Sequence, residues 1–349
     1  MKTTPNLRLL SLLSLATPLF AQGAEHDLRI TAKKGTSVWL LQEAKQENAI
    51  DMGGQQMDMG GSTVHTLQFT VKDVDDKGNL VVETKIVRVH GSMTMPMMGD
   101  VDFDSAKKAE ANEEDDGGGM GMSPGMMTKA FTAMAGKSFI AKIDAYGKVA
   151  SLEGTAEILK APKGGGGMGG GMAPAASEST LRQFVEGAFG TRPSKPAAAG
   201  ATWDHVESDN SNRVPMHTTL KLTLAKVDGD NFEVTAVGTV DKPADKKGDE
   251  AGGNDESPMN EMMKSMKIKN GKVSGTQHVS LKDGFVVDSN NVMAMDVDMA
   301  GPMGGDMSMK MKVTTTIKRT TAEAAMPKAP PAPKKDEKKE DGAKPAPGK

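Results

Sequence analysis

In two neighbouring stretches of this chain, 293–299 and 307–317, apolar side chains occupy nearly every second position. The positions between them hold mainly aspartate, serine and lysine. An alternation with period two is typical of a β-strand that buries one face and exposes the other. The apolar positions are Met293, Met295, Val297, Met299, Met307, Met309, Met311, Val313 and Ile317.

The segment AGPMGGD between these stretches is predicted to be the turn of a hairpin. A turn centred on Met303 fixes which residues of the two strands face each other. The facing pairs would be Met299 with Met307, Val297 with Met309 and Met295 with Met311.

Two longer hairpins are predicted at 65–91 and 217–241, with turns at DDKGN and at Asp228–Gly229. Their apolar residues have the same spacing. Upstream, GTSVW ending at Trp39 matches GATW ending at Trp203. Downstream, GKSFIAKIDAYGKVASLEG is echoed by GTQHVSLKDGFVVDSNN. We infer an internal duplication with a first half at 28–160 and a second half at 197–320.

The predicted fold is therefore mainly β, with two homologous antiparallel β-sheet halves and a few short helices. The linker 161–196 contains one such helix, SESTLRQFVEGAFG. Ser177 or Ser179 can cap it, apolar residues recur at helical spacing, and Gly190 ends it. Two other short helices are predicted at 126–136 and 257–267.

Four segments rich in glycine or proline are predicted to be unstructured. The hydrophobic fraction is only 37% and the aromatic fraction 3%, so part of the chain cannot bury enough surface to fold. The four segments are 105–126, 161–177, 243–256 and the tail 321–349.

The first residues predict export to the periplasm or beyond. Lys2 and Arg8 precede an apolar run that is too short to span a bilayer, and small residues follow it. This order is that of a signal peptide, residues 1–21, with cleavage after Ala21 or after Ala24. No other long apolar run occurs, so no transmembrane span is expected. A net charge of −3 argues against a nucleic-acid partner, and zero cysteines exclude disulfides and thiolate metal sites.

The methionines have two interpretations. Methionine is an adaptable apolar residue, so the alternating strands can line a concave sheet face that binds an apolar ligand. The residues that would line it are Met293, Met295, Met307, Met309 and Met311.

The second interpretation is a soft-metal site, because thioethers suit Cu(I) or Ag(I) where no thiol competes. The 65–91 hairpin is expected to bring His65 opposite the segment 88–90, and a turn at Gly60–Gly61 would bring further methionines to the same sheet end. The six predicted ligands are His65, His90, Met57, Met59, Met93 and Met95.

Catalysis is not expected, and Cu(I) is the one candidate cofactor that the sequence suggests. No G-x-S-x-G, H-E-x-x-H or S-x-x-K motif appears in a suitable setting, and the acidic residues sit mostly in linkers and turns.

The repeat GATW…TLKLTLAKVDGDNFEV and the segment MAGKSFIAKIDAYGKVASLEG resemble a family of exported bacterial proteins of unknown function, frequent in planctomycete-type bacteria. Ala135, Gly136, Lys137, Phe139, Asp144, Gly147 and Val149 fit the family segment A-G-K-x-F-x-x-x-x-D-x-x-G-x-V. The resemblance covers roughly residues 28–320. It implies a duplicated β-rich fold and export, and it implies no mechanism. A weaker likeness is to periplasmic lipoprotein carriers, whose half-open barrels hold an acyl chain.

The sequence thus favours a non-enzymatic exported protein of unknown partner, either a module that binds an apolar ligand or a structural component of the envelope. Soft-metal binding or buffering is the alternative.

Overall fold

The computed structural model describes residues 24–95, 99–107, 128–129, 132–160, 177–209, 216–242, 265–300 and 306–325. The predicted signal peptide lies outside these residues. So do most of the four segments predicted to be unstructured and most of the helix predicted at 257–267. Of the helix predicted at 126–136, residues 128–129 and 132 are helical and residues 133–136 form turns.

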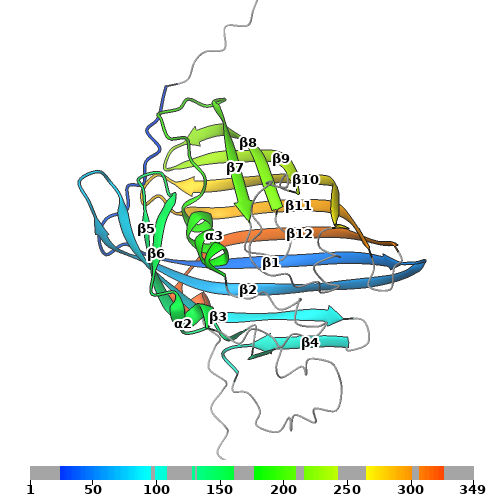
Figure 1. Cartoon of the computed structure of the whole chain (residues 1–349). Coiled ribbons are helices and arrows are strands. Elements are labelled where there is room, and N and C mark those ends of the chain that lie inside the picture. Colours follow the sequence, from blue (N-terminus) through cyan, green and yellow to red (C-terminus); the bar gives the residue numbers. More distant parts are fainter. Residues whose placement is uncertain are drawn as a thin grey trace, which may run out of the picture.

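One large antiparallel sheet of twelve strands dominates the fold (Figure 1). The strands of the first half are β1 (Ser37–Met52), β2 (Gln55–Val74), β3 (Leu80–Met95), β4 (Gly99–Asp104), β5 (Ser138–Ile143) and β6 (Val149–Glu153). Those of the second half are β7 (Thr202–Asp209), β8 (Met216–Asp228), β9 (Asn231–Asp241), β10 (Lys267–Ser280), β11 (Val286–Ala300) and β12 (Asp306–Thr320). The described helices are α2 (Ala156–Leu159), α3 (Glu178–Phe189) and α5 (Ala322–Ala325). The prediction of a mainly β chain with a few short helices is confirmed.

The two halves join into a single sheet. The strand order is β6-β5-β3-β2-β1-β12-β11-β10-β9-β8-β7, with β4 attached to β3 off this path. Each half is a meander in chain order: β1 to β6 run from the middle of the sheet to one edge, and β7 to β12 run from the other edge back to the middle. The first strand of the chain pairs with the last, along the whole of β1. This equal order is what a duplication would produce, and the common origin of the halves stays a prediction.

The methionine hairpin is β11–β12, and its predicted register is confirmed at every pair. Met299 faces Met307, Val297 faces Met309 and Met295 faces Met311. The charged positions pair with each other on the opposite side, with Asp296 beside Lys310. Alternate side chains of a strand point to opposite faces, so the register separates an apolar face from a charged one.

The predicted helix in the linker is α3, and it is capped as expected. The Ser177 hydroxyl accepts a hydrogen bond from the Thr180 backbone amide at 3.1 Å, and Gly190 ends the helix with φ 70°. Its apolar side buries Leu181, Phe184 and Phe189. The segment is therefore part of the core and more than a linker.

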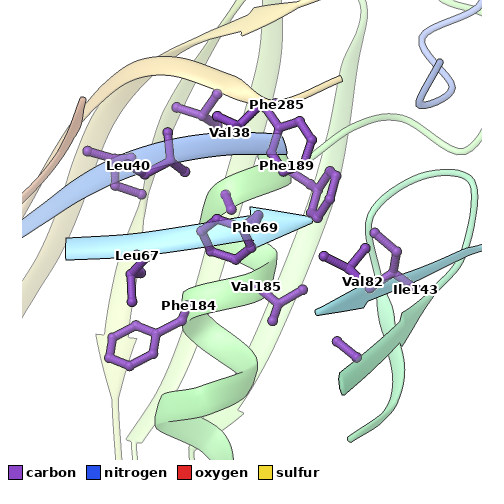
Figure 2. Packing of buried hydrophobic residues seen from close by; sticks show 14 of the residues in the cluster. Val38, Leu40, Leu67, Phe69, Val82, Ile143, Phe184, Val185, Phe189 and Phe285 are labelled. Atoms are coloured by element: carbon purple, nitrogen blue, oxygen red, sulfur yellow. The ribbon is translucent and has the colours of Figure 1, made fainter. Parts of the chain in front are cut away.

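Helix α3 packs on one face of the sheet, which we call the helix face. The phenyl rings of Phe69, Phe189 and Phe285 meet there, with the Phe189–Phe285 ring centres 4.3 Å apart (Figure 2). Strands β1 and β2 contribute Leu40 and Leu67, both almost fully buried. This cluster is the main hydrophobic core.

The same helix also reaches both edge strands. Its Arg182 donates to the Val149 carbonyl of β6, and Glu186 accepts from the Val149 amide at 3.2 Å. On the other side Gln183 donates to Glu207 of β7 at 3.2 Å. Figure 1 shows β6 and β7 turned toward α3 from the two ends of the sheet. The sheet therefore curves around the helix, and its helix face is concave.

The tail prediction is wrong at its first residues. Residues 321–349 were expected to lack structure, but Ala322–Ala325 forms α5, and Ala325 is only 3% exposed. The reason is that small alanine side chains allow this short helix to lie against β1, so it buries surface that the composition of the tail does not suggest. The rest of the tail lies outside the described residues.

A buried arginine ties the C-terminal end of α3 to two distant segments of the chain. Arg192 is 6% exposed and donates to the carbonyls of Leu28 and Phe189, each at 2.8 Å, and to that of Gly284. Its guanidinium lies 5.4 Å from the ring centre of Phe232. Burial lowers the pKa of Arg192 to about 9, so the group remains charged near neutral pH. The carbonyl at the C-terminus of α3 favours a cation there, because the helix dipole is negative at that end.

Replacing Arg192 with methionine is expected to destabilise the protein by about 3 kcal/mol, because buried carbonyls that lose their donor keep their desolvation cost. The measurement is equilibrium unfolding in urea. Arg29→Met is the matched control, since Arg29 lies on the surface and its loss should change stability by less than about 0.5 kcal/mol. Equal stability of the two variants would contradict the role given to Arg192.

Candidate functional site

Beyond α3, the helix face continues as an apolar region that we call the methionine stripe. Its residues come from four adjacent strands, β2, β1, β12 and β11, and lie in register with one another. Met295 is 3% exposed, Met52 is 42% exposed, and the others are half-buried. The stripe consists of Met52, Met57, Met59, Met293, Met295, Met299, Met307, Met309 and Met311.

All five residues predicted to line an apolar ligand belong to the methionine stripe. The stripe forms cross-strand rows, one of which runs from Met59 through Asn48 and Met311 to Met295. Near β10, four side chains pack into a second, smaller hydrophobic cluster, formed by Val240, Met266, Met295 and Val297. The stripe is therefore anchored at its β10 side and increasingly open toward Met52.

The opposite face, which we call the charged face, carries exposed ion pairs on the same strands. Lys312 lies 3.3 Å from Glu47, and Lys269 pairs with Asp298. Such exposed pairs each contribute little to stability. Their effect is to keep this side of the strands in water, so the methionines stay on the helix face.

The six predicted metal ligands do not lie together. His65 faces Val89 in the β2–β3 register, as predicted, but His90 faces Val64. Residues that follow one another in a strand point to opposite faces, so His65 is on the helix face and His90 on the charged face. The structure therefore places the two imidazoles on opposite faces of the sheet.

The turn predicted at Gly60–Gly61 is also absent. Both glycines lie inside β2, and the β1–β2 turn is at Gly53–Gly54. A Cβ atom on Gly61 would come within 2.6 Å of the Ser92 carbonyl oxygen, so this glycine permits close strand approach.

Three methionines of the predicted metal set lie on one face. Met57 and Met59 share the helix face with His65, and Met93 pairs with Gly61 on that face. Met95 pairs with Gly99 of β4. Among the described residues, no three His, Asp or Glu side chains come close enough to hold a metal ion.

His65 packs against α3. Its ring centre lies 4.8 Å from that of Phe184. Burial, with a smaller effect of His90, lowers the pKa of His65 to about 4. The imidazole is therefore neutral in the folded protein at physiological pH.

The sequence did not predict a cavity of about 330 Å³ on the charged face, under α5. Arg88 and Asp104 form a two-point ion pair beside it, at 2.9 and 2.6 Å, which lowers the pKa of Asp104 to about 2. The Thr66 hydroxyl and the His90 Nδ1 atom are buried at its wall without a hydrogen-bond partner in the described structure. Arg88 and His90 are two residues apart in β3, and this spacing predicts a polar strand face. Asp104 comes close to them only because β4 pairs with β3, which the spacing does not predict.

A groove of about 600 Å³ lies further along the strands. Two complete cross-strand rows of residues line it. The row between them, which runs from Met59 to Met295, has its side chains on the helix face. The groove is therefore on the charged face, with backbone as its floor. The two rows are Gly60, Glu47, Lys312 and Ala294, and Asp58, Ala49, Lys310 and Asp296.

The His65 environment predicts a pH-dependent stability. The pKa of about 4 in the folded state is below the ordinary value of 6.5, so the unfolded chain binds more protons between these values. The free energy of unfolding should fall by up to roughly 3 kcal/mol as pH drops through this window. His65→Phe should remove most of this fall in urea titrations at pH 7 and pH 4.5. His205→Gln, which removes one imidazole elsewhere, should retain it, and a retained fall in His65→Phe would contradict the assignment.

No helix among the described residues combines the length and apolar character needed to cross a membrane. No protein of curated function matches this chain.

Solved structures give only remote likenesses. A lipovitellin structure concerned with lipid–protein interactions has TM-score 0.40 and 8% identity over 83% of this chain, which spans 25% of that chain. An engineered protein studied for asymmetric conductivity has TM-score 0.20 and 6% identity over 82% of this chain and 100% of that chain. A DUF1329 family protein from Desulfovibrio piger has TM-score 0.12 and 8% identity over 82% and 85%. At these scores the likenesses carry no conclusion about this chain.

The segment Ala135–Val149 and Trp203, which carry the sequence resemblance, lie within residues 77–286, whereas Trp39 lies outside them. Residues 77–286 are matched by the model of DUF6263, a family of unknown function, and because this match covers more than half of the chain, the protein belongs to that family.

Proposed function

We propose that this protein is an exported, non-enzymatic binding protein that holds an apolar ligand against the methionine stripe. The observation that carries the proposal is the continuity of the concave helix face. The same face that forms the hydrophobic core under α3 extends past the helix as half-buried methionine side chains. An apolar surface in a concavity is the usual form of a small-molecule site.

The dimensions of the stripe suit an elongated ligand. From the row of Gln46 to that of Met52, six residues of β1 span about 20 Å at 3.3 Å per residue. Four strands at about 4.8 Å spacing give a width of about 14 Å. The product, about 300 Å², reaches the size at which an apolar surface patch is often functional. A single acyl chain is the ligand class that such a strip would accommodate.

Polar side chains mark the boundary between the stripe and the core. On the helix face, the row of His65 packs against α3. The next row toward the stripe contains Thr63, Thr315 and Asn291. In the next row, the Gln46 amide donates to the Met311 sulfur at 3.8 Å. Hydroxyl and amide groups at one end of an apolar strip would orient the polar end of an amphipathic ligand, because a few polar groups commonly fix orientation in such sites.

Methionine is well suited to such a surface. Its unbranched side chain has three rotatable bonds and a polarisable sulfur, so it adapts to irregular apolar partners. A stripe of β-branched residues would be stiffer. The proposed ligand class is therefore apolar and variable in shape, and no catalytic step on it is proposed.

Met309→Asp should weaken binding of a fluorescent fatty acid to the purified full chain by at least tenfold. The substitution places a carboxylate at the middle of the stripe, where apolar contact would desolvate it. The matched control is Lys310→Asp, one residue further along β12 on the charged face, which should bind within about twofold of the unaltered protein.

Native mass spectrometry of the unaltered protein provides the second measurement. A lipid that co-purifies and is absent from Met309→Asp would support the proposal. Equal binding by Met309→Asp and Lys310→Asp, or no binding by the unaltered protein, would reject it. The second of these results would favour a structural component of the envelope.

A further inference from the structure

Three methionines face one another across three neighbouring strands at the open end of the stripe. Met307 of β12 pairs with Met52 of β1 on one side and with Met299 of β11 on the other. This run of thioethers is a consequence of strand register and combines residues that are 255 and 8 positions from Met307 in the sequence. We call Met52, Met307 and Met299 the thioether row.

The row has the spacing that a shared ligand needs. Residues directly opposite in an antiparallel pair have Cβ atoms about 4.5–5.5 Å apart. The two outer methionines therefore both neighbour the central one, and three flexible bonds in each side chain let the sulfurs approach a common point. Beside Met299, Met266 directly precedes β10, is 3% exposed and packs in the cluster next to the row. It is placed to be a fourth thioether.

We propose that the thioether row binds a monovalent soft metal ion, Cu(I) or Ag(I). Thioethers are soft ligands that select such ions, and a chain without cysteine has no thiolate to compete for them. Thioethers are also uncharged, so the site adds no negative charge to balance a divalent ion. Zn²⁺ and Cu²⁺, which favour thiolate, imidazole or carboxylate ligands over neutral thioethers, would bind poorly here.

The neighbouring side chains on this face support a monovalent ion. The next row contains Met57, Ile50, Met309 and Val297, and Gln55 flanks Met52 at the strand end. The carboxylates of Asp51 and Asp298 fall on the charged face, because they alternate with Met52 and Met299. The ion would therefore be held by sulfur in apolar surroundings.

Solvent access distinguishes this end of the stripe from the other. Met52 is 42% exposed, whereas Met295 is 3% exposed. A metal ion can therefore reach the thioether row from water, and the buried methionines behind it provide apolar backing. Apolar packing alone does not account for three facing sulfurs, since valine or isoleucine is favoured over methionine in strands.

The test replaces the thioether row by leucine in the full chain, as Met52→Leu, Met299→Leu and Met307→Leu together. Leucine keeps the apolar volume and removes the sulfur, so folding is preserved. Competition with bathocuproine disulfonate under anaerobic conditions should show one Cu(I) per unaltered chain and a loss of at least tenfold in affinity for the triple variant. Met307→Leu alone should lose most of the affinity, because it removes the central sulfur.

The matched control is the triple variant Met293→Leu, Met295→Leu and Met311→Leu, in other rows of the same face, which should bind Cu(I) within about twofold of the unaltered protein. Labelling of methionine methyl groups with carbon-13 gives a readout that a fold defect would not mimic. Ag(I) should shift the signals of Met52, Met299 and Met307 first. Equal affinity of the two triple variants, or first shifts elsewhere, would overturn the proposal.

This inference is independent of the apolar ligand proposed above. Met309→Asp, which should lose the fluorescent fatty acid, should still retain Cu(I).

Discussion

The pairing of β1 with β12 is the contact on which the arrangement of side chains depends. It joins the first strand of the chain to the last over fourteen residue pairs, from Trp39–Thr320 to Met52–Met307. Because side chains alternate with period two, a slip of one residue would move every methionine of β12 to the other side of the sheet relative to β1. The core under α3, the methionine stripe and the charged face all follow from this one register.

A chain with few aromatic residues still forms a core here because many strands pack against one helix. Helix α3 fills the concavity and is hydrogen-bonded to both edge strands, so it also limits how far the sheet can open. Arg192 directly after the helix then connects the first described residues and the β10–β11 turn to its C-terminus. Long strands extend past this short helix, which is why the part of the helix face beyond α3 is left to methionine.

The sequence predicted those features, such as strand register and helix ends, that local residue patterns determine. The β11–β12 register was predictable because alternation and a short turn leave a single arrangement that buries the apolar face, and α3 was predictable from Ser177 and Gly190 at its ends. Gly60 and Gly61 misled because glycine serves two purposes, turning and close approach, and only the neighbouring strand shows which applies. His65 and His90 were predicted to be ligands of one metal ion, but residue 89, and not residue 90, faces residue 65. The Arg88–Asp104 pair and α5 depend on tertiary contacts that no local pattern encodes.

The two proposed occupants of the concave face require different properties of the same residue type. An apolar ligand uses the carbon surface of methionine and gains in proportion to the apolar area that it removes from water, which the half-buried Met309 and Met311 offer in the middle of the stripe. A soft cation uses the sulfur lone pairs and must be reached from water, which favours the end at Met52. The half-buried middle of the stripe and its exposed end at Met52 separate these demands in space. One continuous strand pattern can thus hold both sites, because the first depends on volume and the second on which residues face each other across strands.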